Sequence, residues 1–223
     1  MFVENPDNQW KKLKLDDVCS EIYRYPTFYG LEYKPSGIPV IRIGNILSSG
    51  VVDPELNNYV FIDEEVSMDY PRTIIELNDI VMAVRGDGST AKKIALVNSE
   101  NLVNANISPN VLRFKANTNI VTPFYLFFFL TSTTGQSELN SHVKRTAKKN
   151  ITATDIKGIS IPVPPLDKQM AFSNLAKTIE QEKEFMISQL TKLEENFQAL
   201  LHQAFTGRLQ FRESKVDEYA LKR

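Results

Sequence analysis

Apolar residues in the first part of the chain occur in short runs that are separated by turn-forming residues. Residues 38–43 alternate apolar side chains in a β-branched run that stops at Gly44 and Asn45, a turn signal, and this pattern predicts a strand. Residues 80–85 are almost continuously apolar, as expected of a strand that is covered on both faces. Further strands are expected at 94–97, 110–114 and 159–163.

Proline and glycine positions refine this prediction. The strand at 159–163 is expected at a sheet edge, because Pro162 cannot donate a hydrogen bond to a ladder. The sequence Gly86-Asp87-Gly88-Ser89 is expected to turn the chain between two strands. The apolar spacing of residues 123–139 predicts a single buried helix, with Pro123 in the first turn, where a proline is tolerated.

The pattern changes after Pro164 and Pro165, which form a stiff break. No proline or glycine follows up to Phe205, so the sequence predicts about 40 residues of helix, ~60 Å long, with Asp167 as its N-cap and Gly207 as its stop. Its apolar residues follow a heptad: one series is Ala176, Lys183, Leu190, Phe197 and Ala204, and the other is Ile179, Met186, Leu193 and Leu200. Only Lys183 interrupts this stripe. A stripe of this length needs a partner helix, and the residues expected to form the pair are Ile179, Met186, Leu190, Leu193, Phe197 and Leu200.

Together these patterns predict an α+β fold with three parts. A mixed, strand-rich globular domain is expected over residues 1–165, a long spacer and dimerisation helix over 166–206, and a C-terminal tail over 207–223.

Composition and charge place the chain among globular proteins. Hydrophobic residues make up 42% and charged residues 24%, which argues against disorder. The single cysteine, Cys19, cannot form an internal disulfide, the N-terminus lacks a signal-peptide pattern, and the longest apolar run, residues 124–130, is too short to span a bilayer. We therefore expect a soluble, cytoplasmic protein. The net charge of −1 conceals a basic middle, because residues 72–157 carry 11 Lys and Arg against 6 Asp and Glu.

Catalytic signatures are scarce. The sequence has two histidines and neither a zinc-ligand spacing nor a phosphate-binding loop, so no metal or cofactor is expected on this chain. One alternative is a metal-dependent nuclease, since Pro6-Asp7 followed by Glu32-Tyr33-Lys34 has the order of a Pro-Asp…Glu-x-Lys site. Another alternative is a coiled-coil adaptor that uses only the long helix.

Basic and amide side chains favour nucleic-acid binding. The segment 142–150 contains Lys144, Arg145, Lys148 and Lys149, which we expect to contact phosphates. Arginine and asparagine can each make two hydrogen bonds to one base edge. The residues expected to contact bases or a groove are Arg42, Asn45, Arg85, Lys92, Lys93 and Asn106, all beside predicted strand ends.

Several stretches resemble the specificity subunit of type I restriction–modification enzymes. They are residues 10–18, 37–46, 78–86, 105–110, 161–169 and 200–209, which occur in the family's order. The pair Pro-Pro-Leu-x-x-Gln, at the start of the long helix, and Phe-Thr-Gly-Arg-Leu, at its end, is the most specific part of the match.

The resemblance implies a non-catalytic target-recognition domain that binds one half of a split site in double-stranded DNA. It also implies docking to methyltransferase subunits, which hold S-adenosylmethionine, and to restriction subunits that cleave DNA. The family's subunit usually holds two recognition domains and two helices, whereas this chain holds one of each. It is therefore either a half-length form, expected to pair as a homodimer through the helix, or a fragment of a longer subunit.

Overall fold

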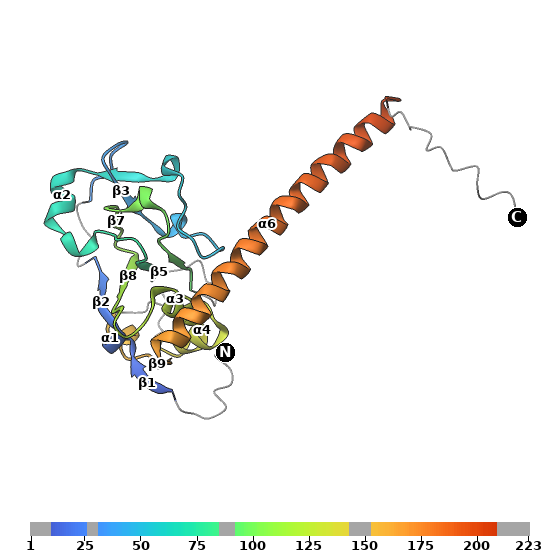
Figure 1. Cartoon of the computed structure of the whole chain (residues 1–223). Helices are drawn as coiled ribbons and strands as arrows, with labels where there is room; N and C mark the ends of the chain where they lie inside the picture. The colour runs from blue at the N-terminus through green and yellow to red at the C-terminus, as the bar shows by residue number, and fades with distance from the viewer. Residues whose placement is uncertain (1–9, 26–30, 85–91, 143–152, 209–223) are drawn as a thin grey trace, which may run out of the picture. The chain divides into compact units, whose positions relative to one another are not determined.

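In the computed structural model, residues 10–25, 31–84, 92–142 and 153–208 are described, and Figure 1 shows strands and helices along them. The strands are β1 (Lys11–Lys14), β2 (Cys19–Arg24), β3 (Ile38–Ile41), β4 (Val60–Ile62), β5 (Ile80–Ala83), β6 (Ile94–Leu96), β7 (Asn106–Ile107), β8 (Val111–Ala116) and β9 (Ser160–Val163). The helices are α1 (Leu15–Val18), α2 (Glu64–Asp69), α3 (Pro123–Thr131), α4 (Thr133–Ser141), α5 (Ala153–Lys157) and α6 (Leu166–Phe205). The predicted α+β class, strands followed by a long helix, is confirmed.

The chain divides into two compact units, Met1–Ser173 and Asn174–Arg223. The first unit contains all the strands named above and the first two turns of α6. The second unit contains the remainder of α6, which continues without a break to Phe205.

The described residues of the first unit form three sheets. The largest is antiparallel and has the strand order β2-β8-β5-β6; the second has the order β4-β3-β7, with β3 and β7 parallel. The third pairs β1 with β9 and places Pro162 opposite Lys12. Each strand of this two-stranded ladder is an edge, which confirms the position predicted from Pro162.

Strand β5 lies between two hydrophobic cores. Ile80 and Met82 face one core, whose helical side includes Tyr125 of α3. Val81 and Ala83 face the other core, which is shared with the second sheet. Because successive side chains of a strand alternate between faces, this arrangement explains why all four β5 residues are buried and confirms the prediction of a strand covered on both faces.

The prediction of one helix over residues 123–139 was wrong. The structure has α3 and α4 instead, and Ser132 lies between them as the N-cap of α4, where its Oγ accepts a hydrogen bond from the Gly135 N–H at 3.1 Å. A Cβ at Gly135 would lie 1.9 Å from the backbone oxygen of Phe129, so only glycine permits this close helix–helix turn. Pro123 does occupy the first turn of α3, as predicted.

The two ends of α6 also test the sequence prediction. The helix begins at Leu166, so Asp167 lies in its first turn and is not the N-cap; the Pro165 carbonyl accepts the hydrogen bonds of Lys168 and Gln169 instead. At the other end, Gly207 has a φ of 67°, and its N–H and that of Arg208 bond back into the last turn. This is the glycine stop that the sequence predicts.

Candidate nucleic-acid interface

The residues before β6 and before β8 lie together at one end of the largest sheet, where β5 ends. The backbone N–H of Ala83 donates to the Lys93 carbonyl at 2.9 Å, and that of Val84 donates to the Asn110 carbonyl at 3.0 Å. Lys93 and Asn110 therefore flank the end of β5 from its two sides. Strands β5 and β6 pair antiparallel, as expected for a turn between them, but the predicted turn at residues 86–89 lies outside the described residues.

Helix α4 holds the residues that lead into β6. The Lys92 N–H donates to Gln136 Oε1 at 2.7 Å, and Gln136 Nε2 donates to the Leu130 carbonyl at 2.8 Å. Lys92 is half-buried and Lys93 is exposed. The structure thus places both predicted lysines at the same sheet end, and Gln136 is a positioning residue that the sequence alone did not reveal.

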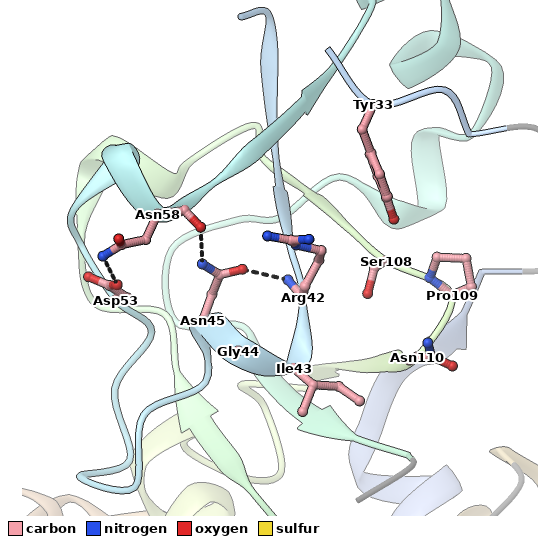
Figure 2. A pocket seen from close by; sticks show the side chains of 10 residues that line it. All are labelled: Tyr33, Arg42, Ile43, Gly44, Asn45, Asp53, Asn58, Ser108, Pro109 and Asn110. Carbon is pink, nitrogen blue, oxygen red and sulfur yellow. Dashed lines mark hydrogen bonds between the residues drawn. The ribbon is translucent and has the colours of Figure 1, made fainter. Parts of the chain in front are cut away.

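A pocket of about 730 Å³ lies beside this sheet end (Figure 2). Residues that follow β3 and residues that precede β8 both contribute to it. The lining residues are Tyr33, Arg42, Ile43, Gly44, Asn45, Asp53, Asn58, Ser108, Pro109 and Asn110. Asn110 connects the pocket to β5 through its hydrogen bond from Val84.

Asn45 forms part of the pocket wall. Its Oδ1 accepts a hydrogen bond from the Arg42 N–H at 2.9 Å, and its Nδ2 donates to the Asn58 carbonyl at 3.1 Å (Figure 2). Asn58 Nδ2 in turn donates to Asp53 Oδ2 at 2.8 Å. Asn45 is 3% exposed, so both ends of this amide shape the loop, and the structure does not present them to a ligand.

Asn106 lies in β7 and is buried. Its Oδ1 accepts a hydrogen bond from Ser67 Oγ at 2.7 Å, and its Nδ2 donates to Thr73 Oγ1 at 2.5 Å. The structure does not bring this predicted base-contact residue to the surface or into the pocket. Both ends of its amide join α2 and the following turn to the second sheet.

Arg42 differs from the arginines that the fold uses internally. Its guanidinium is exposed and lies 5.9 Å from the centroid of the Tyr33 ring, and it makes no ion pair with the described residues. By contrast, Arg113 is buried and its Nε donates to Asp79 Oδ2 at 2.7 Å, while Arg72 Nε donates to Glu21 Oε1 at 2.6 Å. Arg42 is therefore available for an external acceptor.

Arg24 adds a further cationic side chain to this region. Its Nε donates to the carbonyl of Pro109, which lines the pocket, at 2.9 Å. The remaining predicted contact residues, Arg85, Lys144, Arg145, Lys148 and Lys149, lie outside the described residues. No signal in the sequence indicates Tyr33 as a pocket residue, whereas Asn110 belongs to a run of asparagines with Asn104 and Asn106 whose amides suit a base edge.

The described residues offer few other chemical sites. No group of three or more His, Cys, Asp or Glu side chains among them could hold a metal ion. Of the nuclease alternative's residues, Asp7 lies outside the described part, Glu32 is exposed, and Lys34 pairs with Asp63 at 3.3 Å. Within the same ranges, no helix has the length and apolarity needed to cross a membrane.

The second unit exposes most of the predicted heptad stripe, of which Ala176 is buried. Each of the six residues expected to form the helix pair is more than half exposed in the single chain: Ile179, Met186, Leu190, Leu193, Phe197 and Leu200. Isolated exposed apolar side chains are common, but a row of them along one helix is typical of a protein interface.

Comparison with known proteins assigns the chain to a family. The type I restriction modification DNA specificity domain matches residues 7–195. The chain is 28% identical over 212 residues to the EcoBI specificity subunit of Escherichia coli, covering 90% of this chain and 42% of that protein. It is 23% identical over 201 residues to the MjaVIII specificity subunit of Methanocaldococcus jannaschii, covering 90% and 46%. The chain therefore spans about half the length of these relatives.

Solved structures have the same fold. The HsdS subunit from Thermoanaerobacter tengcongensis has a TM-score of 0.59 at 18% identity, over 94% of this chain and 52% of that one. A chain in a structure of type I R-M system assembly has a TM-score of 0.60 at 18% identity, over 92% and 49%. The identification made from the sequence, a specificity subunit of a type I system, is confirmed by the family match and by these relatives. The chain belongs to the family of type I restriction modification DNA specificity domains.

Proposed function

We propose that the chain binds one half of a bipartite double-stranded DNA target and docks the methyltransferase and restriction subunits of a type I system. The observation that carries this proposal is the family match over residues 7–195. In this role the chain holds no cofactor of its own, and S-adenosylmethionine belongs to the methyltransferase subunit.

The proposed DNA-binding face consists of the end of the largest sheet, with Lys92 and Lys93, and the adjacent pocket that Arg42 lines. Its cations would neutralise phosphates and so make binding depend on salt, while Arg42 is free to contact a base edge. Arg85, which directly follows Val84 in the sequence, is proposed to contact DNA as well, and the basic segment with Lys144, Arg145, Lys148 and Lys149 would add phosphate contacts.

Helix α6 is proposed to pair with the same helix of a second copy. Two copies would match the length of the relatives, of which one chain covers 42–46%. A symmetric pair would present two identical recognition units and bind a palindromic split site. The exposed heptad stripe supplies the apolar surface that such a pair needs.

Sedimentation of the chain, alone and with its methyltransferase subunit at low and moderate salt, tests the proposal. We expect a dimer, or a complex of two chains with two methyltransferases, that binds DNA with salt-dependent affinity. A monomer that does not bind the methyltransferase subunit would refute the assembly role. Magnesium-dependent cleavage abolished by Glu32→Ala would favour the nuclease alternative, and assembly without DNA binding would favour the adaptor.

Two substitutions separate phosphate contacts from base contacts. Lys148→Ala should weaken binding to all sequences similarly and lower the salt slope by about one unit. Arg85→Ala should cost roughly 1–3 kcal/mol, mainly on the cognate site. Equal proportional losses of specific and non-specific binding in both variants would contradict the assigned roles.

A further inference from the structure

Asn110 has a side-chain amide that the fold leaves unused. Its Oδ1 is buried and has no hydrogen-bond partner, and within the described part of the chain its Nδ2 is not bonded either. An acceptor buried without a partner is costly, so native structures keep few of them, and each needs an explanation. Asn45 and Asn106 provide the contrast, because both ends of their amides are bonded.

The position of Asn110 joins this unused amide to the pocket. Residues that precede β8 place Asn110 in the lining together with Ser108, and Figure 2 shows Arg42 among the same lining residues. Arg42 and Asn110 are 68 positions apart in the sequence, but neither has an internal partner for its polar side-chain groups among the described residues. The fold thus brings an available guanidinium and an available amide to one pocket.

The pocket suits a base edge better than a phosphate. Asp53 places a carboxylate in the lining, and this negative charge opposes a phosphate group. The lining also offers the Tyr33 ring, and an aromatic face can contact a base. An amide has one donor and one acceptor side by side, which match N7 and the N6 amino group of adenine.

We propose that Asn110 is a specificity-determining residue that contacts one adenine of the target half-site. The inference rests on the proposed function, because it requires this chain to bind DNA. Rotation of the amide about χ2 breaks no internal hydrogen bond, so Asn110 can present its donor and acceptor to the base at little cost. Arg42 lies in the same pocket and contacts an adjacent acceptor.

Selection from a library of randomised DNA duplexes tests this assignment. Three complexes of the chain with its methyltransferase subunits are compared: the natural chain, the Asn110→Ala variant and the Asn110→Asp variant. The natural complex should select adenine at one position, and Asn110→Ala should reduce that preference by about 5- to 150-fold, the discrimination of one bidentate pair. Asn110→Asp keeps an acceptor but loses the donor, so the preference should move toward cytosine, whose N4 donates.

Controls separate a base contact from a structural role. Asn101→Ala, on an exposed turn, should leave the base preference unchanged. Asn110→Ala should not lower the Tm, because it removes no internal hydrogen bond. If both Asn110 variants select the natural sequence with full discrimination, the inference is wrong and the proposed function stands. If the natural complex selects no sequence, the inference and the proposed function both fail.

Discussion

Burial separates the polar residues of the first unit into structural and available groups. Arg113 and Asp79 are each 3% exposed and form an ion pair that joins β8 to the turn before β5. Breaking such a pair on one side leaves a buried charge without a partner, which is strongly destabilising. Arg42 and Asn110 have no such internal partner, and they are the residues that the pocket can offer to a ligand.

Cys19 is predicted to be inert while the protein is folded. The thiol is buried, and burial raises its pKa to about 12, so little of the reactive thiolate exists at neutral pH. A thiol-specific reagent should therefore label the native protein at least about 100 times more slowly than the protein in denaturant. Because Cys19 is the only cysteine, a single absorbance trace follows its labelling. Rapid labelling under native conditions would contradict the buried position.

Glu76 should make stability depend on acidic pH. The hydrogen bond from Lys115 holds the pKa of Glu76 below its ordinary value of 4.5. The unfolded chain therefore binds this proton more readily than the folded one, so the stabilisation is present above pH 4.5 and is lost as the pH falls through the lowered pKa. Urea unfolding should show that the stability difference between the natural protein and Glu76→Gln shrinks over this range.

Lys115→Met provides the matched background for that experiment. Without the principal partner of Glu76, the substitution Glu76→Gln should have a smaller and less pH-dependent effect, because only Arg113 still lowers the pKa of Glu76. An undiminished pH dependence in the Lys115→Met protein would show that another group is responsible.

Single residues were predictable where the local backbone determines their role. Pro123 and Gly207 were placed correctly because a proline ring suits a first turn and glycine tolerates a positive φ. The bonded amide of Asn106 was not predictable, because its partners Ser67 and Thr73 come from distant segments. The pocket was missed for the same reason, since it joins residues from separate loops.

At the scale of elements, periodicity predicted strands well and helix boundaries less well. Strand β5 and helix α6 follow strong patterns of apolar residues, and both formed as predicted. The break between α3 and α4 depends on the Ser132 cap and on the contact of Gly135 with Phe129, which is a tertiary constraint. Hydrophobic spacing alone does not encode such a contact.

Gln169 explains the motif at the start of α6 and supports a prediction at this scale. The side chain is fully buried; its Oε1 accepts from the Thr122 N–H at 2.8 Å, and its Nε2 donates to the carbonyls of Ile120 and Pro164 at 3.0 and 2.8 Å. Gln169→Ala leaves these backbone groups without partners and should lower the free energy of unfolding by about 2–4 kcal/mol in urea titrations. Lys168→Ala, at an exposed neighbouring position, should change it by less than about 0.5 kcal/mol.

At the scale of the whole molecule, the surface proposed for DNA recognition and the surface proposed for assembly lie in different units. The basic residues of 72–157 belong to the first unit, whereas the exposed heptad belongs to the second. Changes in one function should therefore leave the other intact. This separation allows assembly to be tested by substitutions that leave the first unit folded.

Leu193 is the residue of choice for that test, because it lies in the middle of a heptad series. Leu193→Asp would bury a charge in the proposed helix pair, and we expect the dimer Kd to rise by about 100-fold, or ~3 kcal/mol, because the charge loses its hydration. Sedimentation equilibrium measures the Kd, and an unchanged Tm of the first unit would show that this unit remains folded. Phe185→Asp is the matched control: Phe185 is 65% exposed against 64% for Leu193, but lies outside both heptad series. If Phe185→Asp dissociates the chains and Leu193→Asp does not, the helices pair through a different face.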